Sequence, residues 1–196
     1  MSIRTNPQSI AGNWDFGIAL DLHTTSSKVI GTTPDGHPEF ENTYSEIGKL
    51  LNRLKYQHDQ GAAKPIIEAA VAFLRPHLKK IDIIIPVPPS VVRGVQPVLV
   101  LARGIAAGLA LPLRECLRKA RQTSPLKGIR DPDQRRKEIR GAFVVDASHT
   151  AGKNVLIFDD LFSSGATLSE ITDVLKRQGG VASVRVLTIT RTRTEE

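Results

Sequence analysis

Residues 155–167 read Val155-Leu156-Ile157-Phe158-Asp159-Asp160-Leu161-Phe162-Ser163-Ser164-Gly165-Ala166-Thr167. The first four residues are apolar and predict a buried strand, which ends in two adjacent carboxylates. A small turn with two serines and a glycine follows, and a helical pattern begins directly after it. Open α/β sheets bind ligands at the carboxyl ends of their parallel strands, so this order predicts a binding site at the turn.

The turn is suited to an anion. The first turn of a helix presents unpaired backbone N–H groups and a partial positive charge. Glycine lets the backbone come close to a phosphate, and hydroxyl groups add donors. We therefore expect this stretch to hold a phosphate with Ser163, Ser164, Gly165, Ala166 and Thr167.

The paired acids suit a different part of the same ligand. Asp159 and Asp160 repel phosphate, but they can accept hydrogen bonds from the hydroxyls of a ribose or bind Mg²⁺. Acids before a turn and hydroxyls at a helix start are also ordinary capping residues. Their order directly behind an apolar strand favours a sugar-phosphate site. No Lys follows Gly165, which excludes the Walker phosphate loop, and no Gly-x-Gly-x-x-Gly fingerprint is present.

The rest of the chain repeats the strand–helix alternation. Its periodicity and turn residues predict strands at 16–22, 27–30, 81–87, 113–117, 155–158 and 184–189, and helices at 44–58, 65–76, 97–110 and 166–178. Such alternation predicts an α/β fold with a doubly wound parallel sheet covered by helices on both faces. We expect residues 1–43 to form a leader and a small hairpin (16–40) that acts as a hood, and residues 44–196 to form the main domain.

Composition narrows the class of protein. The 196 residues are 40% hydrophobic and 24% charged, as in soluble globular proteins. No stretch has the roughly 20 apolar residues of a membrane span, and the opening residues lack the apolar core of a secretory signal. A cytoplasmic location is expected.

The single cysteine, Cys116, excludes an internal disulfide and is expected to be buried. The five histidines are expected at the surface.

Charge is concentrated in one segment. The chain carries 27 Lys and Arg against 20 Asp and Glu, a net charge of +7. Residues 114–140 hold ten basic and four acidic residues and so account for +6 of it. A basic segment beside a phosphate motif favours a polyanionic ligand, although solvated surface charge explains the same pattern.

Residues 155–167 resemble the phosphoribosyl-pyrophosphate (PRPP) motif of type I phosphoribosyltransferases. Within that superfamily, residues 44–190 are most similar to the ComF-like competence proteins. Three further stretches carry the resemblance: residues 50–56 (LLNRLKY), residues 84–88 (IIPVP) followed by Arg93 and Gly94, and Arg135 followed by residues 141–143 (GAF). The cysteine-rich zinc ribbon that often begins ComF-like proteins is missing from this sequence, and Glu138 stands where the family usually has Asn.

The resemblance implies an α/β phosphoribosyltransferase fold and a mechanism. PRPP binds with Mg²⁺, a nitrogen acceptor such as a nucleobase or amine attacks the anomeric carbon, and pyrophosphate leaves with inversion. Asp159 and Asp160 would be the catalytic acids on the ribose and the residues nearest the Mg²⁺. The pyrophosphate would meet a loop and a basic segment that together comprise Val87, Pro88, Pro89, Ser90, Arg93, Lys119, Arg121 and Arg135.

Two alternative functions also agree with the sequence. One is a non-catalytic regulator that binds PRPP, and the other is a DNA-uptake protein whose basic segment contacts nucleic acid. Aromatic residues make up only 5% of the chain, which disfavours a stacking platform for single strands. No membrane partner is expected, and an apolar edge is compatible with a homodimer. Lys55 and Tyr56 are expected to support either the site or the core, and the core is favoured. For Trp14, packing at a domain edge is favoured over stacking on a base.

Overall fold

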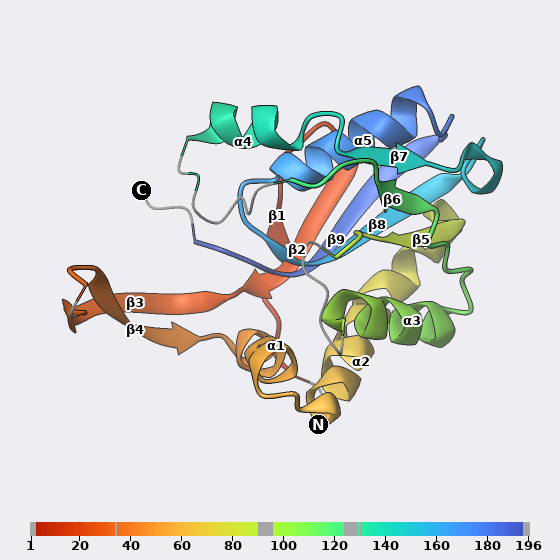
Figure 1. Ribbon diagram of the computed structural model, residues 1–196. Helices are drawn as coiled ribbons and strands as arrows, with labels where there is room; N and C mark the ends of the chain where they lie inside the picture. The colour runs from red at the N-terminus through yellow and green to blue at the C-terminus, as the bar shows by residue number, and fades with distance from the viewer. Residues whose placement is uncertain (1–2, 34, 90–95, 124–128, 130, 194–196) are drawn as a thin grey trace.

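A five-stranded sheet runs through the centre of the computed structural model, which describes residues 3–33, 35–89, 96–123, 129 and 131–193 (Figure 1). Its strand order is β1-β2-β9-β8-β5, and all neighbours are parallel except the short β1. The strands are β1 (Gln8–Ser9), β2 (Phe16–Leu22), β5 (Ile83–Pro86), β8 (Asn154–Phe162) and β9 (Ser183–Arg191). The carboxyl ends of the four parallel strands therefore meet at one edge.

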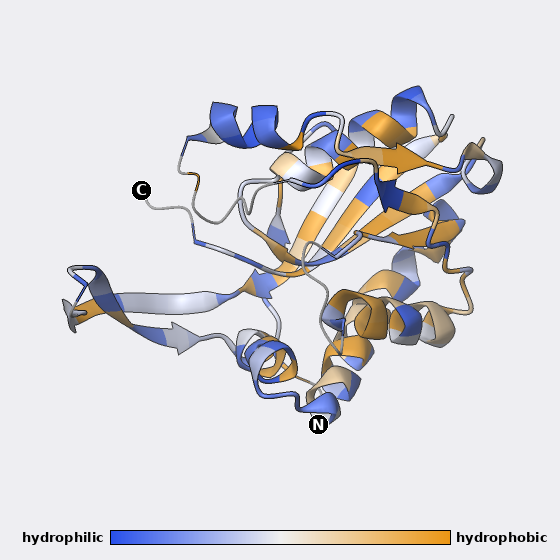
Figure 2. Cartoon of the chain, viewed as in Figure 1, coloured by the Kyte–Doolittle hydropathy of each residue, from blue (hydrophilic) through white to orange (hydrophobic). Residues whose placement is uncertain are grey.

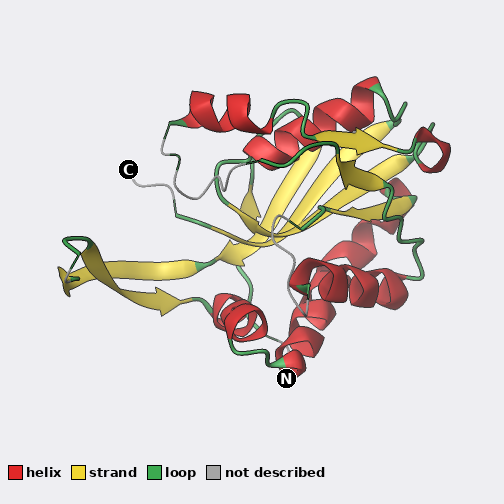
Figure 3. Ribbon diagram, in the orientation of Figure 1, coloured by secondary structure: helices red, strands yellow, loops and turns green. Residues whose placement is uncertain are grey.

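Helices cover both faces of this sheet, as the alternating pattern predicted (Figure 3). One face packs on α1 (Glu46–Tyr56), α2 (Ala63–Leu74) and α3 (Pro97–Leu109). The other face packs on α5 (Ala166–Arg177), α4 (Pro132–Ile139) and the small β6–β7 pair. Apolar residues fill the sheet between these layers (Figure 2). The predicted α/β fold with a largely parallel, doubly covered sheet is confirmed.

The helix starts follow from local chemistry. Ser45 caps α1, because its hydroxyl accepts a hydrogen bond from the Gly48 N–H at 3.0 Å. Pro97 opens α3 at a position where its missing N–H costs no hydrogen bond. The short 3₁₀ segments Gln60–Ala62, Arg75–Lys80 and Ala147–His149 join neighbouring elements.

The N-terminal hairpin differs from the prediction. Residues 16–22 do not pair with the next strand but form β2 of the central sheet, where they run parallel to β9. The hairpin consists of β3 (Thr24–Thr32) and β4 (Pro38–Tyr44), and it projects away from the sheet (Figure 1). Alternation within 16–22 does not reveal its partner, because pairing is set by long-range packing. The expected boundary at residue 43 stays a prediction.

The segment 113–117 also differs from the prediction. Instead of a full strand it makes a single bridge, between Leu113 and Ile84. The regular strand begins at its end, where β6 (Leu117–Lys119) pairs antiparallel with β7 (Phe143–Val145).

Among the helices of the described ranges, none combines the length and the apolar composition that a membrane span requires.

Candidate functional site

The predicted phosphate turn lies at the carboxyl end of β8 and leads directly into α5. Gly165 precedes the helix with φ +74°, a left-handed conformation that favours glycine. A Cβ on Gly165 would lie 3.0 Å from the Phe162 ring. Ser163 and Ser164 are exposed, whereas Ala166 is buried as the first residue of α5. The turn and the first N–H groups of α5 thus form one continuous stretch of donors at the sheet edge.

An aromatic pair supports this turn from below. The Trp14 and Phe162 rings meet edge to face with centroids 6.2 Å apart. The indole N–H of Trp14 donates a 2.9 Å hydrogen bond to the Ile10 carbonyl, and only 8% of Trp14 is exposed. Trp14 is thus a core residue that packs beneath Gly165, and its expected place at a domain edge stays a prediction.

Asp159 and Asp160 leave β8 toward opposite faces of the sheet, because side chains alternate along a strand. Asp160 is in phase with Phe158 and Leu156, which pack on the α1–α3 side. There its carboxylate meets the Lys55 ammonium of α1 at 2.8 Å, with side-chain exposures of 13% and 12%. The sequence favours the core over the site for Lys55. The structure places Lys55 beside Asp160, and its position in the LLNRLKY helix end is the sequence feature that points to this location.

Asp159 is half-buried on the other side of the strand, in phase with Ile157. Its carboxylate accepts a 2.8 Å hydrogen bond from the backbone N–H of Asp160. Burial, followed by the negative charge of Asp160, raises the pKa of Asp159 to about 7. Near pH 7 the carboxyl group of Asp159 is therefore protonated in part of the molecules. Only when it is ionised does the pair carry a negative charge beyond the one that Lys55 neutralises.

His23 joins the same cluster, contrary to the expectation that every histidine is a surface residue. It follows β2 directly, and its Nδ1 lies 3.1 Å from the hydroxyl of Thr190 on β9. Its ring meets the Tyr44 ring edge to face with centroids 5.4 Å apart. Burial first, and then the charge of Lys55, lowers the pKa of His23, while Asp160 opposes that shift. Strand pairing brings His23 here, so spacing along the sequence gave no signal of it.

The predicted pyrophosphate residues are described only in part. Val87 continues β5 and donates its N–H to the Phe158 carbonyl at 2.9 Å, so its backbone stays beside the strand that carries the acids. Pro88 and Pro89 extend from it, half-buried and exposed respectively. Ser90 and Arg93 lie outside the described residues. Their proposed contact with pyrophosphate stays a prediction.

The basic segment has structural contacts of its own. Arg121 donates hydrogen bonds to the carbonyls of Glu138 (2.6 Å) and Arg140 (2.9 Å), which caps the end of α4. Arg135 donates to the Ile129 carbonyl, and Lys119 lies 3.4 Å from the Thr123 hydroxyl. These contacts leave the predicted roles of the three residues toward pyrophosphate untested.

The two acids are the candidate ligands for Mg²⁺. Asp159 and Asp160 supply the oxygen ligands that Mg²⁺ prefers, but Lys55 already neutralises one of them. In the described part of the chain, no three His, Cys, Asp or Glu side chains converge to hold a metal ion. The residues thus fit a cation that arrives with a phosphate ligand better than a resident ion.

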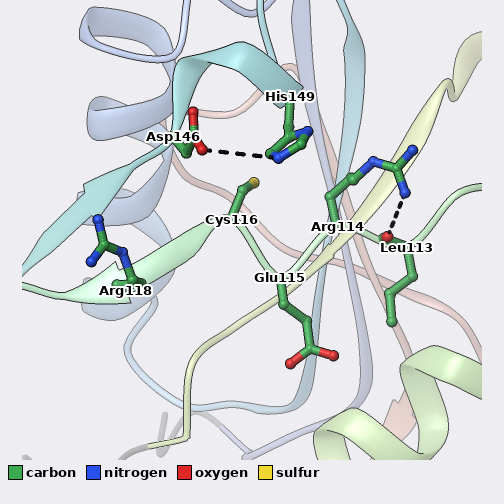
Figure 4. Close-up of a pocket in the computed structure, with 7 residues that line it drawn as sticks. All are labelled: Leu113, Arg114, Glu115, Cys116, Arg118, Asp146 and His149. Carbon is green, nitrogen blue, oxygen red and sulfur yellow. Dashed lines mark hydrogen bonds and ion pairs between the residues drawn. The ribbon is translucent and has the colours of Figure 1, made fainter.

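A cavity of about 270 Å³ lies elsewhere, beside the β6–β7 pair (Figure 4). Arg114, Arg118, Asp146 and His149 line it, together with the buried Cys116, whose side chain lies between Asp146 and His149 (Figure 4). Burial raises the pKa of Cys116, so its sulfur remains a thiol at neutral pH. The expectation that Cys116 is buried is confirmed.

Comparison with known proteins bears on the fold. No protein-family model matches the sequence, and no curated protein sequence matches it. The chain is similar to the adenine phosphoribosyltransferase of Saccharomyces cerevisiae solved with adenine and an imino-altritol bisphosphate, at 14% identity over 84% of each chain and a TM-score of 0.51. It is similar to the Trypanosoma brucei enzyme solved with AMP, pyrophosphate and ribose-5-phosphate, at 11% identity over 96% of this chain and 87% of that one, with a TM-score of 0.51.

A further match is to an allosteric regulatory enzyme of purine biosynthesis, at 20% identity and a TM-score of 0.45 over 65% of this chain. The chain spans 26% of that enzyme's length. The agreement with the two adenine phosphoribosyltransferases extends over most of their length and includes the parallel sheet with helices on both faces. The chain therefore has the α/β fold of the type I phosphoribosyltransferases.

Proposed function

We propose that this protein is a phosphoribosyltransferase, which binds PRPP with Mg²⁺ and transfers ribose 5-phosphate to a nitrogen acceptor. One observation carries the proposal: β8 delivers Asp159 and Asp160 to the same edge at which Gly165 begins α5. This arrangement offers carboxylates for hydroxyls and backbone donors for a phosphate within one strand–turn–helix unit. Its occurrence in a chain with the phosphoribosyltransferase fold supports the assignment.

Different residues of the site contact different parts of PRPP. The turn from Ser163 to Thr167 holds the 5′-phosphate with backbone N–H groups and hydroxyls. Asp159 and Asp160 accept hydrogen bonds from the ribose hydroxyls and stabilise the positive charge that develops at the anomeric carbon. Lys55 holds the Asp160 side chain in place through their 2.8 Å ion pair.

The leaving group lies on the β5 side. The backbone that follows β5 at Val87, Pro88 and Pro89 faces the pyrophosphate, and Lys119, Arg121 and Arg135 supply cations to it. Bound Mg²⁺ would neutralise pyrophosphate charge, with Asp159 and Asp160 as its nearest protein oxygens. The yeast and trypanosomal proteins were solved with adenine or AMP, which makes a nucleobase the first class of acceptor to test.

Calorimetry with PRPP and Mg²⁺ tests the proposal. The parent protein is expected to bind, and the double variant Asp159→Asn/Asp160→Asn is expected to lose at least tenfold in affinity. Pyrophosphate release with a panel of nucleobases then separates an enzyme from a regulator, which would bind PRPP without turnover. Equal PRPP affinity in parent and double variant would refute the assignment of the acids.

A further inference from the structure

The strand order places the two partners of the proposed reaction on opposite sides of β8. Four strand ends lie side by side at the site edge, in the order β5, β8, β9 and β2. If the proposed function holds, pyrophosphate lies over the loop after β5 and ribose lies over β8. The ends of β9 and β2 lie on the side of β8 away from β5 (Figure 1). Under the proposed function, this is the side of the ribose away from the leaving group.

The chemistry of the transfer requires that side for the acceptor. In a displacement with inversion at the anomeric carbon, the nucleophile approaches opposite the bond that breaks. An acceptor nitrogen must therefore approach over the ends of β9 and β2. His23 and Thr190 are the polar side chains that the structure joins there.

His23 is held firmly by its backbone and by one ring nitrogen. Its N–H donates a 2.7 Å hydrogen bond to the Arg191 carbonyl, which continues the β2–β9 pairing past the last strand residue. Nδ1 lies 3.1 Å from the Thr190 hydroxyl, and Thr190 is fully buried. Among the described residues, Nε2 has no hydrogen-bond partner. The ring is thus fixed on one side, and its second nitrogen remains for a ligand.

We infer that His23 is a catalytic residue for the acceptor: its Nε2 hydrogen-bonds the incoming nitrogen and takes the proton that this nitrogen loses. This inference rests on the proposed function. The acceptor lone pair forms the C1′–N bond, the C1′–O bond breaks, and its electron pair leaves with pyrophosphate. The acceptor N–H proton moves to Nε2, while Nδ1–H donates to Thr190.

The charges around His23 agree with this role. Burial and the Lys55 ammonium keep the free imidazole neutral at pH 7, so Nε2 has a lone pair to offer. The Asp160 carboxylate acts on the ring in the opposite sense and stabilises the imidazolium that forms. The Tyr44 ring of β4 contacts the His23 ring edge to face. Lys55 of α1 and Asp160 of β8 act on the ring through their charges.

The test compares His23→Asn with His37→Asn, the same change at an exposed residue of the hairpin turn. Pyrophosphate release from PRPP and Mg²⁺ is measured with adenine, orotate and ammonia, and with water alone as the nucleophile. We expect His23→Asn to lower kcat about 100-fold or more, within the range of general base catalysis, while PRPP affinity changes less than twofold. His37→Asn should leave both unchanged.

The pH profile gives a second readout that a purely structural role would not move. The parent's kcat/KM should rise through an inflection below pH 6.5, the usual value for His, and this limb should be absent in His23→Asn. A variant that retains more than a third of the parent kcat, or the same acid limb, overturns the inference while the proposed function stands. A parent that releases pyrophosphate with none of the nucleophiles overturns both, and the proposal then reduces to PRPP binding.

Discussion

The Lys55 ammonium lies 2.8 Å from the carboxylate of Asp160, and both side chains are largely buried. The pair joins the end of α1 to the end of β8, two segments more than one hundred residues apart in the chain. Removing one partner of a buried pair leaves an uncompensated charge, which costs more than the pair itself contributes. The relationship therefore makes specific predictions for stability and for binding.

Lys55→Met is expected to lower the free energy of unfolding by about 3 kcal/mol, because the largely buried Asp160 carboxylate then has lost its cationic partner. Urea unfolding at pH 7 measures it. Lys64→Met, on an exposed position of α2, is the matched control and should cost little. Adding Asp160→Asn to Lys55→Met should restore part of the loss. If the two changes are simply additive, the ion pair does not couple them.

Asp159 makes stability depend on pH. Its pKa rises from 3.8 in the unfolded chain to about 7 in the fold, so the folded state retains a proton that the unfolded state has lost. The resulting stability is complete below about pH 4 and falls as the pH rises through 7. Asp159→Asn should flatten this slope and add on the order of 2 kcal/mol at pH 8.

Urea unfolding of Asp159→Asn at pH 5 and pH 8 checks this prediction, with Asp35→Asn at an exposed position of the hairpin turn as control. A parent that is equally stable at both pH values would contradict the burial of Asp159. The same variant should bind PRPP more weakly, so stability and ligand affinity are expected to change in opposite directions.

Gly165→Ala tests the geometry of the phosphate turn. The φ of +74° and the 3.0 Å approach to the Phe162 ring both oppose a side chain, and we expect a loss of about 2 kcal/mol. Gly36→Ala is the matched control, since φ is +80° but no atom lies within 4 Å of the added carbon. Urea unfolding should show the larger loss at Gly165, and only Gly165→Ala should weaken PRPP binding.

Trp14 provides a direct optical probe of the same turn. It is the one tryptophan of the chain, and its ring would lie 3.5 Å from a Cβ on Gly165. Binding of PRPP and Mg²⁺ at the turn should change its fluorescence with a midpoint equal to the calorimetric Kd. The Asp159→Asn/Asp160→Asn variant should show no such change at the same concentrations. A signal of equal size in that variant would place the ligand elsewhere.

The strands and helices that build the site were predictable from local pattern. The apolar run before Asp159, the glycine before α5 and the proline at the start of α3 each act within a few residues, and all three elements formed as expected. The hairpin and the strand at 113–117 were misplaced, because the partner of a short strand is chosen by packing across the whole chain.

By itself the sequence determined the order of a buried strand, two acids, a glycine turn and a helix, because hydrophobic period and backbone conformation are local properties. Only the tertiary structure decided which distant groups act on those acids. Parallel pairing of β2 with β9 brings His23 to Thr190, and packing of α1 on the sheet brings Lys55 to Asp160. Such contacts depend on strand order and helix packing, which couple residues that no spacing in the sequence connects.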